Sequence, residues 1–388
     1  MKIMYINVTY KQGSHGNMVS MLHQDIKKDG HQSFVLYGRG KKTKDKDVYK
    51  IASNIENKVH ALLTRLTGFH GFFSPFATLK AKILIRKIKP NIIHLHELHA
   101  YYINMDAIIK YINKKKIKTY FTFHSEMMYT GKCGFSFDCN KFEDTCNHCP
   151  LVKEYPKSIM FDQVKPMHEW RKKAFDGFAR LHVLSPSKWL ISQYQRSFLK
   201  DVPITHINNG IDETNFLKEY DRPHKNKYIL AVANKIDSDP RKGFQDLKIL
   251  ATRLLKHDID VVVIGAVLDH KTLPSNMHVI KRTNAQELLA SYYQHAHAFV
   301  ILSQMENQPL TVIESLMSGT PVIGYDVGGI IEMASEHYLK TVPYGKILDI
   351  EKLILNLSDL NKQVIQEEAC KLYSKKIFLK QHSDLYFK

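Results

Sequence analysis

Two carboxylates eight residues apart bracket the segment Glu306-Asn-Gln-Pro-Leu-Thr-Val-Ile-Glu314, and Met317-Ser-Gly-Thr-Pro-Val-Ile-Gly324 follows closely. The pattern predicts a loop carboxylate, a helix opened by a proline, and a second carboxylate on that helix. Pro309 fits the first helical position, where its missing N–H group costs nothing. The N–H groups of Leu310 and Thr311 would then be free to meet an anion or hydroxyl groups.

A ligand with both a diphosphate and a ribose diol suits such a site. The carboxylate of Glu314 could accept two hydrogen bonds from vicinal hydroxyl groups, as acidic residues do in dinucleotide-binding folds. The simpler alternative is a surface helix with two solvated glutamates, because a short motif is weak evidence by itself. The surrounding sequence favours the ligand site.

Strand-like runs alternate with helix-like runs along the chain, as in doubly wound parallel sheets. The predicted strands form two series, residues 2–8, 33–37, 91–95, 118–123, 180–184 and 204–208, then residues 228–233, 260–264, 278–281, 298–302 and 321–325. Two series predict an α/β protein with two Rossmann-like domains. Ligands of such sheets bind outside the carboxyl ends of the strands, so we expect the active site in the cleft between the domains.

The length of 388 residues also favours two domains. We place the linker at Asp221–Lys227, a polar segment with a proline and no apolar periodicity. The predicted N-terminal domain covers residues 1–215 with a cysteine-rich loop at 125–155, and the C-terminal domain covers residues 216–365. Residues 366–388 are predicted to form a helix that packs back on the N-terminal domain.

Composition excludes some classes of protein. No uninterrupted apolar run approaches the roughly 18 residues that span a bilayer. The apolar start at residues 1–8 ends too early for a signal peptide, so we expect a cytoplasmic protein. Basic residues number 56 against 38 acidic ones, a balance of +18 that predicts an anionic partner or surface.

Part of this charge is concentrated between residues 80 and 118, where ten basic residues stand against two acidic ones. Beside them, Phe76, Leu79, Ile83 and Leu84 recur at helical spacing. A basic amphipathic helix of this kind suits an anionic membrane surface. A helix whose apolar stripe is buried in the core beneath a solvated lysine rim would show the same pattern, and both interpretations stay open.

Cations and glycines recur after the predicted strands. Arg241-Lys242-Gly243 follows the first strand of the second domain, where two cations could neutralise a diphosphate. Gly328-Gly329 and Gly13-Ser-His-Gly16 fit either phosphate-binding turns or plain tight turns. His124 ends a predicted strand, where an imidazole can donate to a sugar hydroxyl, although a lone histidine is more often structural.

Four of the five cysteines cluster as Cys133-x5-Cys139-x6-Cys146-x2-Cys149. In a cytoplasmic chain thiols stay reduced, so close clustering indicates a metal before a disulfide. Four thiolates, or three with His148, would suit a structural zinc ion without a catalytic role. Reduced or incidentally paired cysteines are the alternative.

Together these motifs resemble the retaining GT-B glycosyltransferases of family 4, in a subgroup found in bacterial polysaccharide gene clusters. The resemblance runs over nearly the whole chain. Besides the segments above, it rests on Ile93-His-Leu-His-Glu-Leu-His99, Tyr101-Tyr-Ile-Asn104, Thr122-Phe-His124, Thr130-Gly-Lys-Cys133, Cys146-Asn-His-Cys-Pro150, Ser185-Pro-Ser-Lys-Trp189 and Asn208-Asn-Gly-Ile-Asp212.

The resemblance implies the GT-B fold and transfer of a hexose or N-acetylhexosamine from a UDP-sugar to a lipid-linked glycan, with retention and without a catalytic cofactor. It further implies O-antigen, capsule or exopolysaccharide synthesis at the inner face of the plasma membrane, where the protein binds peripherally. The alternative enzymes are a GT-B-shaped sugar-nucleotide epimerase and a phosphorylase. The alternative outside enzymes is a basic nucleic-acid-binding protein, but none of the usual recognition modules occurs, so we expect no nucleic-acid partner.

The resemblance also assigns roles to residues. Glu314 would hold the ribose, and Glu306 would contact the transferred sugar. Arg241 and Lys242 would stabilise the departing diphosphate, on which charge builds up in the transition state. The other predicted donor-binding residues are Gly13, which lets the first loop close, and Arg282, Asn307, Gln308, Pro309 and Leu310; His124, over the sugar, completes the predicted catalytic set of Glu306, His124, Arg241 and Lys242.

Two segments depart from the family pattern. Ala233-Asn-Lys235 stands where many relatives have Gly-Arg, which leaves Arg241 or Lys235 to supply the second cation. His124-Ser-Glu-Met-Met128 stands where relatives of this subgroup carry His-Asp and an aromatic residue. We therefore expect this chain to handle its acceptor differently.

Overall fold

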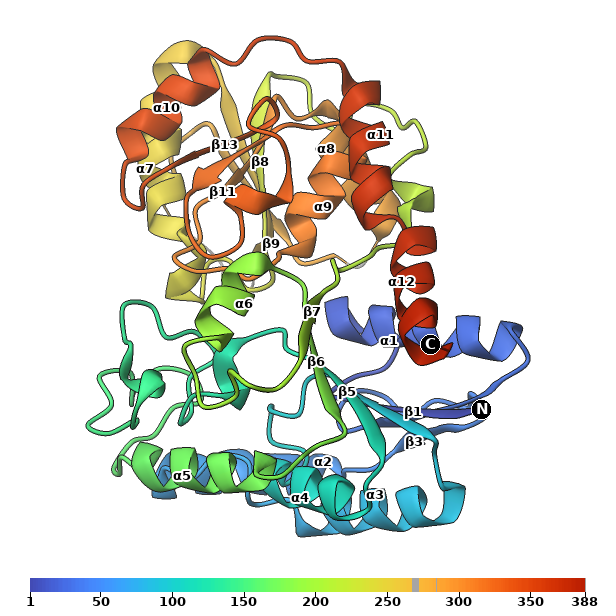
Figure 1. The fold of residues 1–388 in the computed structure, drawn as a ribbon. Coiled ribbons are helices and arrows are strands. Elements are labelled where there is room, and N and C mark those ends of the chain that lie inside the picture. Colours follow the sequence, from blue (N-terminus) through green and yellow to red (C-terminus); the bar gives the residue numbers. More distant parts are fainter. Residues whose placement is uncertain (267–271, 284, 388) are drawn as a thin grey trace. The chain divides into compact units, whose positions relative to one another are not determined.

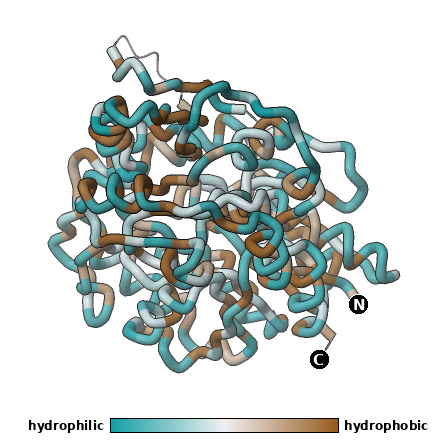
Figure 2. The backbone as a smooth tube through the Cα atoms, turned by 90° about the horizontal axis from the view of Figure 1, so that it is seen from above, coloured by the Kyte–Doolittle hydropathy of each residue, from teal (hydrophilic) through white to brown (hydrophobic). Residues whose placement is uncertain are grey.

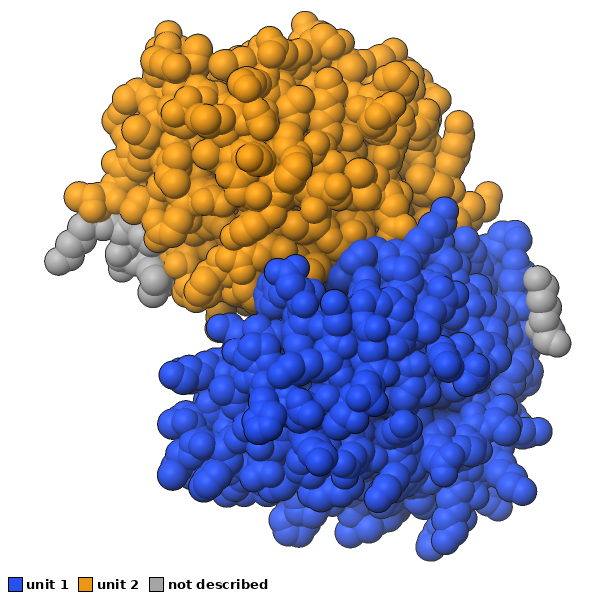
Figure 3. Space-filling view, turned by 60° about the vertical axis from the view of Figure 1, so that its left-hand side comes forward, with its two compact units in different colours: residues 1–207, 379–388 blue, residues 208–378 orange. Residues whose placement is uncertain are grey.

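The computed structural model describes residues 1–266, 272–283 and 285–387. Two compact units make up the chain (Figure 3): unit 1 contains residues 1–207 and 379–388, and unit 2 contains residues 208–378. Each unit is built on one parallel sheet (Figure 1). The segment 221–227, predicted as a linker, is instead packed within unit 2, where His224 and Asn226 hydrogen-bond Asp260.

Unit 1 has a seven-stranded parallel sheet in the order β3-β2-β1-β4-β5-β6-β7. Strands β2 and β4 pair with opposite sides of β1, so the strand order reverses direction there. At such a point the loops after neighbouring strands diverge and leave room for a ligand. The strands are β1 (Lys2–Asn7), β2 (Gln32–Tyr37), β3 (Val48–Lys50), β4 (Ile92–Leu95), β5 (Lys118–Thr122), β6 (Leu181–Ser185) and β7 (Ile204–His206).

Helices cover both faces of this sheet, with α2 to α5 together on one side (Figure 1). Ser53, Asn104 and Ser187 begin α2, α4 and α6 by accepting hydrogen bonds from first-turn N–H groups. The helices are α1 (Gly13–Lys28), α2 (Asn54–Thr67), α3 (Pro75–Ile88), α4 (Met105–Lys114), α5 (Val164–Phe175) and α6 (Lys188–Tyr194).

The two faces of β1 bury different partners. Met4 and Ile6 join the large apolar core of the unit, whereas Tyr5 lies against Tyr386 of α12 (Lys375–Phe387). The hydroxyl of Tyr386 lies 2.5 Å from His94 Nδ1, so the end of α12 is fixed to strand β4.

Unit 2 has a six-stranded parallel sheet in the order β10-β9-β8-β11-β12-β13. Two separate apolar cores cover its faces, as expected for a parallel sheet buried on both sides. The strands are β8 (Tyr228–Val232), β9 (Asp260–Ala266), β10 (Met277–Lys281), β11 (Ala298–Ile301), β12 (Val322–Tyr325) and β13 (Leu339–Val342).

Helices α7 and α10 lie on one face of this sheet, and α8, α9 and α11 lie on the other (Figure 1). Their bounds are α7 (Phe244–Leu254), α8 (Gln286–His295), α9 (Leu310–Met317), α10 (Ile347–Leu355) and α11 (Lys362–Tyr373). Short 3₁₀ helices complete the described part of the chain: η1 (Glu126–Met128), η2 (Lys141–Glu143), η3 (Glu213–Asn215), η4 (Pro240–Lys242), η5 (Leu255–His257) and η6 (Ile331–Met333).

The prediction of an α/β protein with two Rossmann-like domains is confirmed. Every predicted strand is present with both ends within two residues of the predicted bounds, and β3 and β13 are additional. Hydrophobic and hydrophilic stretches alternate along the described residues of the tube (Figure 2). None of the described helices has the length and apolar character that crossing a membrane requires.

Candidate active site

The predicted donor-binding residues of unit 2 lie where its strands end. Arg241 and Lys242 follow β8, Glu306 follows β11, and Glu314 is on α9. Because the strands are parallel, these loops meet at one edge of the sheet. Lys242 Nζ lies 2.6 Å from Glu306 Oε1, so the fold brings together a predicted cation and a predicted carboxylate that are distant in sequence.

The neighbouring cations have different surroundings. Arg241 Nε and Nη2 donate to the two carboxylate oxygens of Asp239 at 3.0 and 2.7 Å. Asp239 therefore partly neutralises the charge of Arg241. Arg282 follows the edge strand β10 and is exposed. The side chain of Lys242 therefore contacts Glu306 directly, whereas Arg241 contacts the same loop through its carbonyl, which accepts from Gln304 N–H at 2.8 Å.

The Glu306 loop is fixed by a glycine turn. Gly329 N–H donates to the Glu306 carbonyl at 3.0 Å, and Gly328 has φ +60°. A Cβ atom added to Gly328 would lie 1.7 Å from that carbonyl oxygen. Gly328 thus permits a close approach to the backbone of Glu306. The turn therefore fixes the main-chain position from which the Glu306 side chain extends.

Replacement of Gly328 by alanine should destabilise unit 2 and weaken UDP binding, because the added methyl group must displace the Glu306 backbone. We expect a loss of about 1–3 kcal/mol in the free energy of unfolding from the strained φ, which a control shares, and a further loss from the clash. Gly345→Ala is the matched control, because Gly345 has φ +81° but no atom within 4 Å of an added Cβ. Equal losses in denaturant titrations and equal UDP affinities for the two variants would contradict this prediction.

Gln308 and Pro309 have structural roles at the start of α9. The Gln308 Oε1 atom accepts from Asn209 N–H at 2.6 Å, and its carbonyl accepts from Asn209 Nδ2 at 3.1 Å. Pro309 lies one residue before α9 rather than at its first position, and its carbonyl accepts from Val312 N–H. The first-turn N–H groups at Leu310 and Thr311 have no preceding helical carbonyl, as at the start of any α-helix, and their contact with a ligand stays a prediction.

Glu314 has an unusual protonation equilibrium. Its carboxylate accepts a hydrogen bond from the Tyr293 hydroxyl at 3.1 Å. Burial raises the pKa of Glu314 to about 7, and the hydrogen bond from Tyr293 opposes this rise only in part. Near neutral pH the carboxyl group is therefore close to half-protonated, and a ligand that donates to it would draw it into the ionised form.

In unit 1, His124 belongs to a cluster of buried imidazoles at the carboxyl ends of β4 and β5. The His15 ring stacks on His124 with centroids 4.0 Å apart, and His96 Nδ1 lies 3.2 Å from His124 Nε2. Burial keeps the pKa of His124 and of His96 well below the usual value. Both rings are therefore neutral at physiological pH and can donate or accept hydrogen bonds.

Glu97 is a candidate site residue that lies in one of the quoted motifs but was assigned no role from the sequence. Burial alone would raise its pKa, but His99 and His15 outweigh that effect and lower it below the ordinary value. Glu97 pairs closely with His99 Nε2, and His15 Nδ1 lies 4.0 Å from its other oxygen. The run His94-Leu-His-Glu-Leu-His99, which begins in β4 and continues past its end, is the available signal for this buried, ionised carboxylate.

Gly13 begins α1 with φ +67°, and an added Cβ would meet no atom within 4 Å. The backbone conformation, rather than crowding, therefore calls for glycine at this position.

Comparison with known families assigns both units. The profile described as Glycosyltransferase Family 4 matches residues 16–215, and the one described as Glycosyl transferases group 1 matches residues 212–376. The chain belongs to glycosyltransferase family 4. The predicted family and the GT-B fold are thus confirmed, and the protein is a glycosyltransferase.

Individual relatives of this family 4 glycosyltransferase are distant. It is 24% identical over 378 residues to a protein of Escherichia coli (strain K12) named as the colanic acid biosynthesis glycosyl transferase WcaC, covering 91% of this chain and 90% of WcaC. Sucrose-phosphate synthase from Thermosynechococcus elongatus shares the fold with a TM-score of 0.71 at 16% identity, covering 100% of this chain and 98% of that one. HepE of Anabaena in complex with UDP-glucose gives a TM-score of 0.65 at 12% identity, with coverage of 100% and 99%.

The cysteine-rich loop of the glycosyltransferase does not support the predicted zinc site. Among the described residues, the only group of three or more potential ligands within 4.8 Å of one another is His224, Asp260 and His278, which contains none of Cys133, Cys139, Cys146 and Cys149. Burial raises the pKa of the Cys133 and Cys146 thiols to about 12. No three of these sulfurs lie within 4.8 Å of one another.

Other contacts hold this loop in the glycosyltransferase. The buried carboxylate of Glu126 accepts from Ser136 N–H at 2.5 Å and from the Tyr129 hydroxyl at 3.1 Å. The buried Arg171 bridges Asp106 and the Met127 carbonyl. Glu126, which lies in the segment that departs from the family pattern, therefore takes part in fixing the chain after His124.

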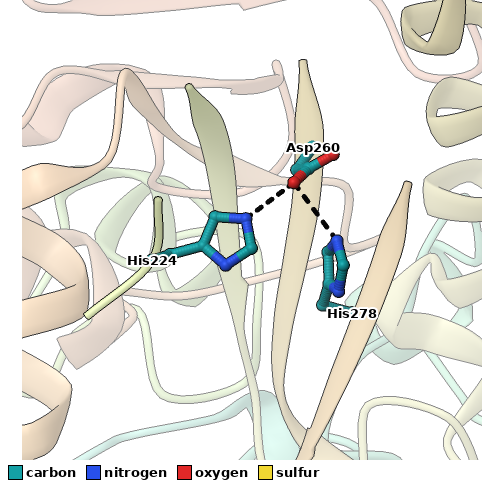
Figure 4. A group of neighbouring side chains, drawn as sticks. All are labelled: His224, Asp260 and His278. Carbon is teal, nitrogen blue, oxygen red and sulfur yellow. Dashed lines mark hydrogen bonds and ion pairs between the residues drawn. The ribbon is translucent and has the colours of Figure 1, made fainter. Parts of the chain in front are cut away.

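The group of His224, Asp260 and His278 lies at the amino ends of strands β8 to β10 (Figure 4). Both imidazole Nε2 atoms approach Asp260 Oδ2, at 2.7 Å from His224 and 3.2 Å from His278. Two imidazoles and one carboxylate are ligands that suit zinc. The group lies at the opposite edge of the sheet from Glu306, so it takes no part in the candidate donor site of the glycosyltransferase.

Proposed function

We propose that this glycosyltransferase moves a hexose or N-acetylhexosamine from a UDP-sugar to a lipid-linked glycan, with retention of anomeric configuration, in the synthesis of a bacterial surface polysaccharide. The name of WcaC refers to colanic acid biosynthesis, which supports the polysaccharide context. The structures of HepE contain UDP or UDP-glucose, which supports a uridine nucleotide donor.

The contact between Lys242 and Glu306 carries this proposal. A diphosphate bound beside β8 would attract Lys242 and release Glu306 to accept from sugar hydroxyl groups. Glu314, on helix α9, would accept hydrogen bonds from the ribose hydroxyl groups. Positive charge then lies where the departing diphosphate gains negative charge, and this is the arrangement that lowers the barrier to transfer.

A screen of UDP-sugars tests the proposal. UDP should raise the melting temperature of the protein, whereas a duplex oligonucleotide should not. One UDP-sugar should be consumed with formation of UDP and of a product whose new linkage keeps the anomeric configuration, as measured by NMR. Conversion of the sugar-nucleotide without an acceptor would favour the epimerase, and dependence on inorganic phosphate would favour the phosphorylase. Stabilisation by the oligonucleotide alone would overturn the enzyme assignment of the site.

We further propose that α3 binds the anionic inner face of the plasma membrane. Phe76, Leu79 and Ile83 are 76%, 56% and 54% exposed, so they are not part of the core, while Leu84 is partly buried. The side chains of Lys80, Arg86 and Lys87 on the same helix are exposed as well. Helices of this kind bind bilayers in two ways. The exposed apolar side chains insert among the lipids, and the cations are attracted to anionic headgroups.

Replacement of Phe76, Leu79 and Ile83 by serine should lower binding to phosphatidylglycerol vesicles by at least about tenfold, because inserted apolar area drives the partition. The control replaces Ile249, Ile331 and Leu348 by serine, three residues of unit 2 with exposures of 49%, 53% and 50%. Vesicle sedimentation measures the bound fraction. Unchanged sedimentation of the α3 variant would refute the proposal for this helix.

A further inference from the structure

Unit 1 contains a cavity of about 720 Å³ that the donor site does not use. It is built from the loop after β1, the loop after β2, the end of β3 and one face of α2. All three strands are parallel, so the cavity lies at the carboxyl edge of the sheet, where ligands of this fold bind. His124 and Glu97 lie at the same edge, after β5 and β4.

The cavity is strongly cationic. None of the described residues that line it is acidic, and its six cations are Arg39, Lys41, Lys42, Lys50, Lys58 and Arg65. Lys50 Nζ donates to the Gly40 carbonyl at 2.7 Å and to Asn54 Oδ1 at 3.0 Å, and Arg39 donates to the Ala100 carbonyl, so these partners are neutral. Six like charges around one cavity would together attract a polyanion.

The helix that supplies one wall of the cavity also carries an exposed apolar row. Asn54, Lys58, Ala61 and Arg65 of α2 line the cavity, and the residue after each of them is an exposed apolar one. Successive helical residues are about 100° apart, so the apolar row runs beside the cavity along the same helix. The exposed apolar residues that form this row are Ile55, Val59, Leu62 and Leu66.

We propose that this cavity binds the phosphate or diphosphate that links the acceptor to its lipid, with the hydrocarbon chain leaving along the apolar row of α2. The inference rests on the proposed function and names the acceptor group that unit 1 recognises. A cationic cavity next to exposed apolar side chains is complementary to an amphiphile with an anionic head, and neither feature suits a neutral soluble glycan. The acceptor sugar would then extend toward His124 and Glu97 at the same edge.

Titration of farnesyl diphosphate into protein saturated with UDP tests this site, because UDP fills the donor site of unit 2. Replacement of Lys41, Lys42 and Lys58 by glutamine should weaken binding by at least about tenfold through loss of charge-assisted contacts. The control replaces Lys110, Lys114 and Lys173 by glutamine, which removes the same charge from a second basic cavity of unit 1. That cavity lies before β5 and β6, at the opposite edge of the sheet, and the control should bind like the wild type.

Two further probes distinguish the contribution of the lipid chain from that of the diphosphate head. Farnesol should not bind measurably, and inorganic diphosphate should bind more weakly than farnesyl diphosphate. Equal affinities for farnesyl diphosphate and inorganic diphosphate would overturn the lipid assignment, and unchanged binding by the cavity variant would overturn the site. UDP binding is measured beforehand in a separate titration, so failure of the donor assignment would be seen independently of failure at this cavity.

Discussion

Replacement of Lys242 by alanine is expected to lower kcat by about 10²–10³-fold at saturating UDP-sugar, the usual effect of removing one group that stabilises transition-state charge. Lys242 Nζ lies 2.6 Å from Glu306 Oε1 and is the cation that unit 2 places against its candidate catalytic loop. Its interaction with the diphosphate strengthens as the glycosidic bond breaks, so kcat should fall more than KM rises.

A steady-state assay with the donor found by the screen measures this effect. Lys371→Ala is the control, because Lys371 is an exposed lysine of α11 in the same unit. Lys242→Arg should restore part of the rate, since it keeps the charge. A kcat within twofold of the wild type for Lys242→Ala would exclude a catalytic role for this residue.

Replacement of Glu314 by alanine is expected to abolish detectable transfer while the far-ultraviolet circular dichroism stays unchanged, because the ribose loses its acceptor. The raised pKa of about 7 adds a pH dependence. If ribose binds to the ionised carboxylate, the affinity of the wild type for UDP should be about tenfold weaker near pH 6 than near pH 8. Calorimetric titration of Glu314→Gln supplies the control, since its affinity should follow only the titration of UDP itself.

The carboxyl group of Glu314 also determines whether the stability of the protein rises or falls with pH. Folding raises the pKa of Glu314, so the protonated carboxyl stabilises the ligand-free protein at low pH, and this contribution is lost as the pH rises through about 7. The melting temperature of the wild type should therefore fall between pH 6 and pH 8 relative to that of Glu314→Gln. A parallel pH dependence of the two proteins would show that this carboxyl titrates normally.

The strands could be predicted from sequence because central strands of a parallel sheet are buried on both faces and read as continuous apolar runs. The two strands that were not predicted are edge strands, β3 and β13, and each is short and contains a lysine. Pairing with a neighbour, rather than an apolar run, makes these segments strands. Sequence patterns therefore define the centre of each sheet better than its margins.

The candidate site was predictable to the extent that its residues follow strands. Lys242 and Glu306 were identified from loops at the same edge, and the structure brings them into contact. Glu97 was not, because its ionised state depends on His15, which comes from a distant segment, as well as on the neighbouring His99. The cysteines show the converse error, since spacing along the chain does not determine whether side chains converge in space.

Both outermost strands of the seven-stranded sheet, β3 and β7, are only three residues long. A border this short offers few unpaired main-chain groups against which another copy could add a strand. An enzyme that gathers on a membrane meets its own copies at high local density, where open sheet borders invite self-assembly. The shortness of β3 and β7 therefore disfavours pairing between the sheet edges of two copies of unit 1 at the membrane surface that we propose.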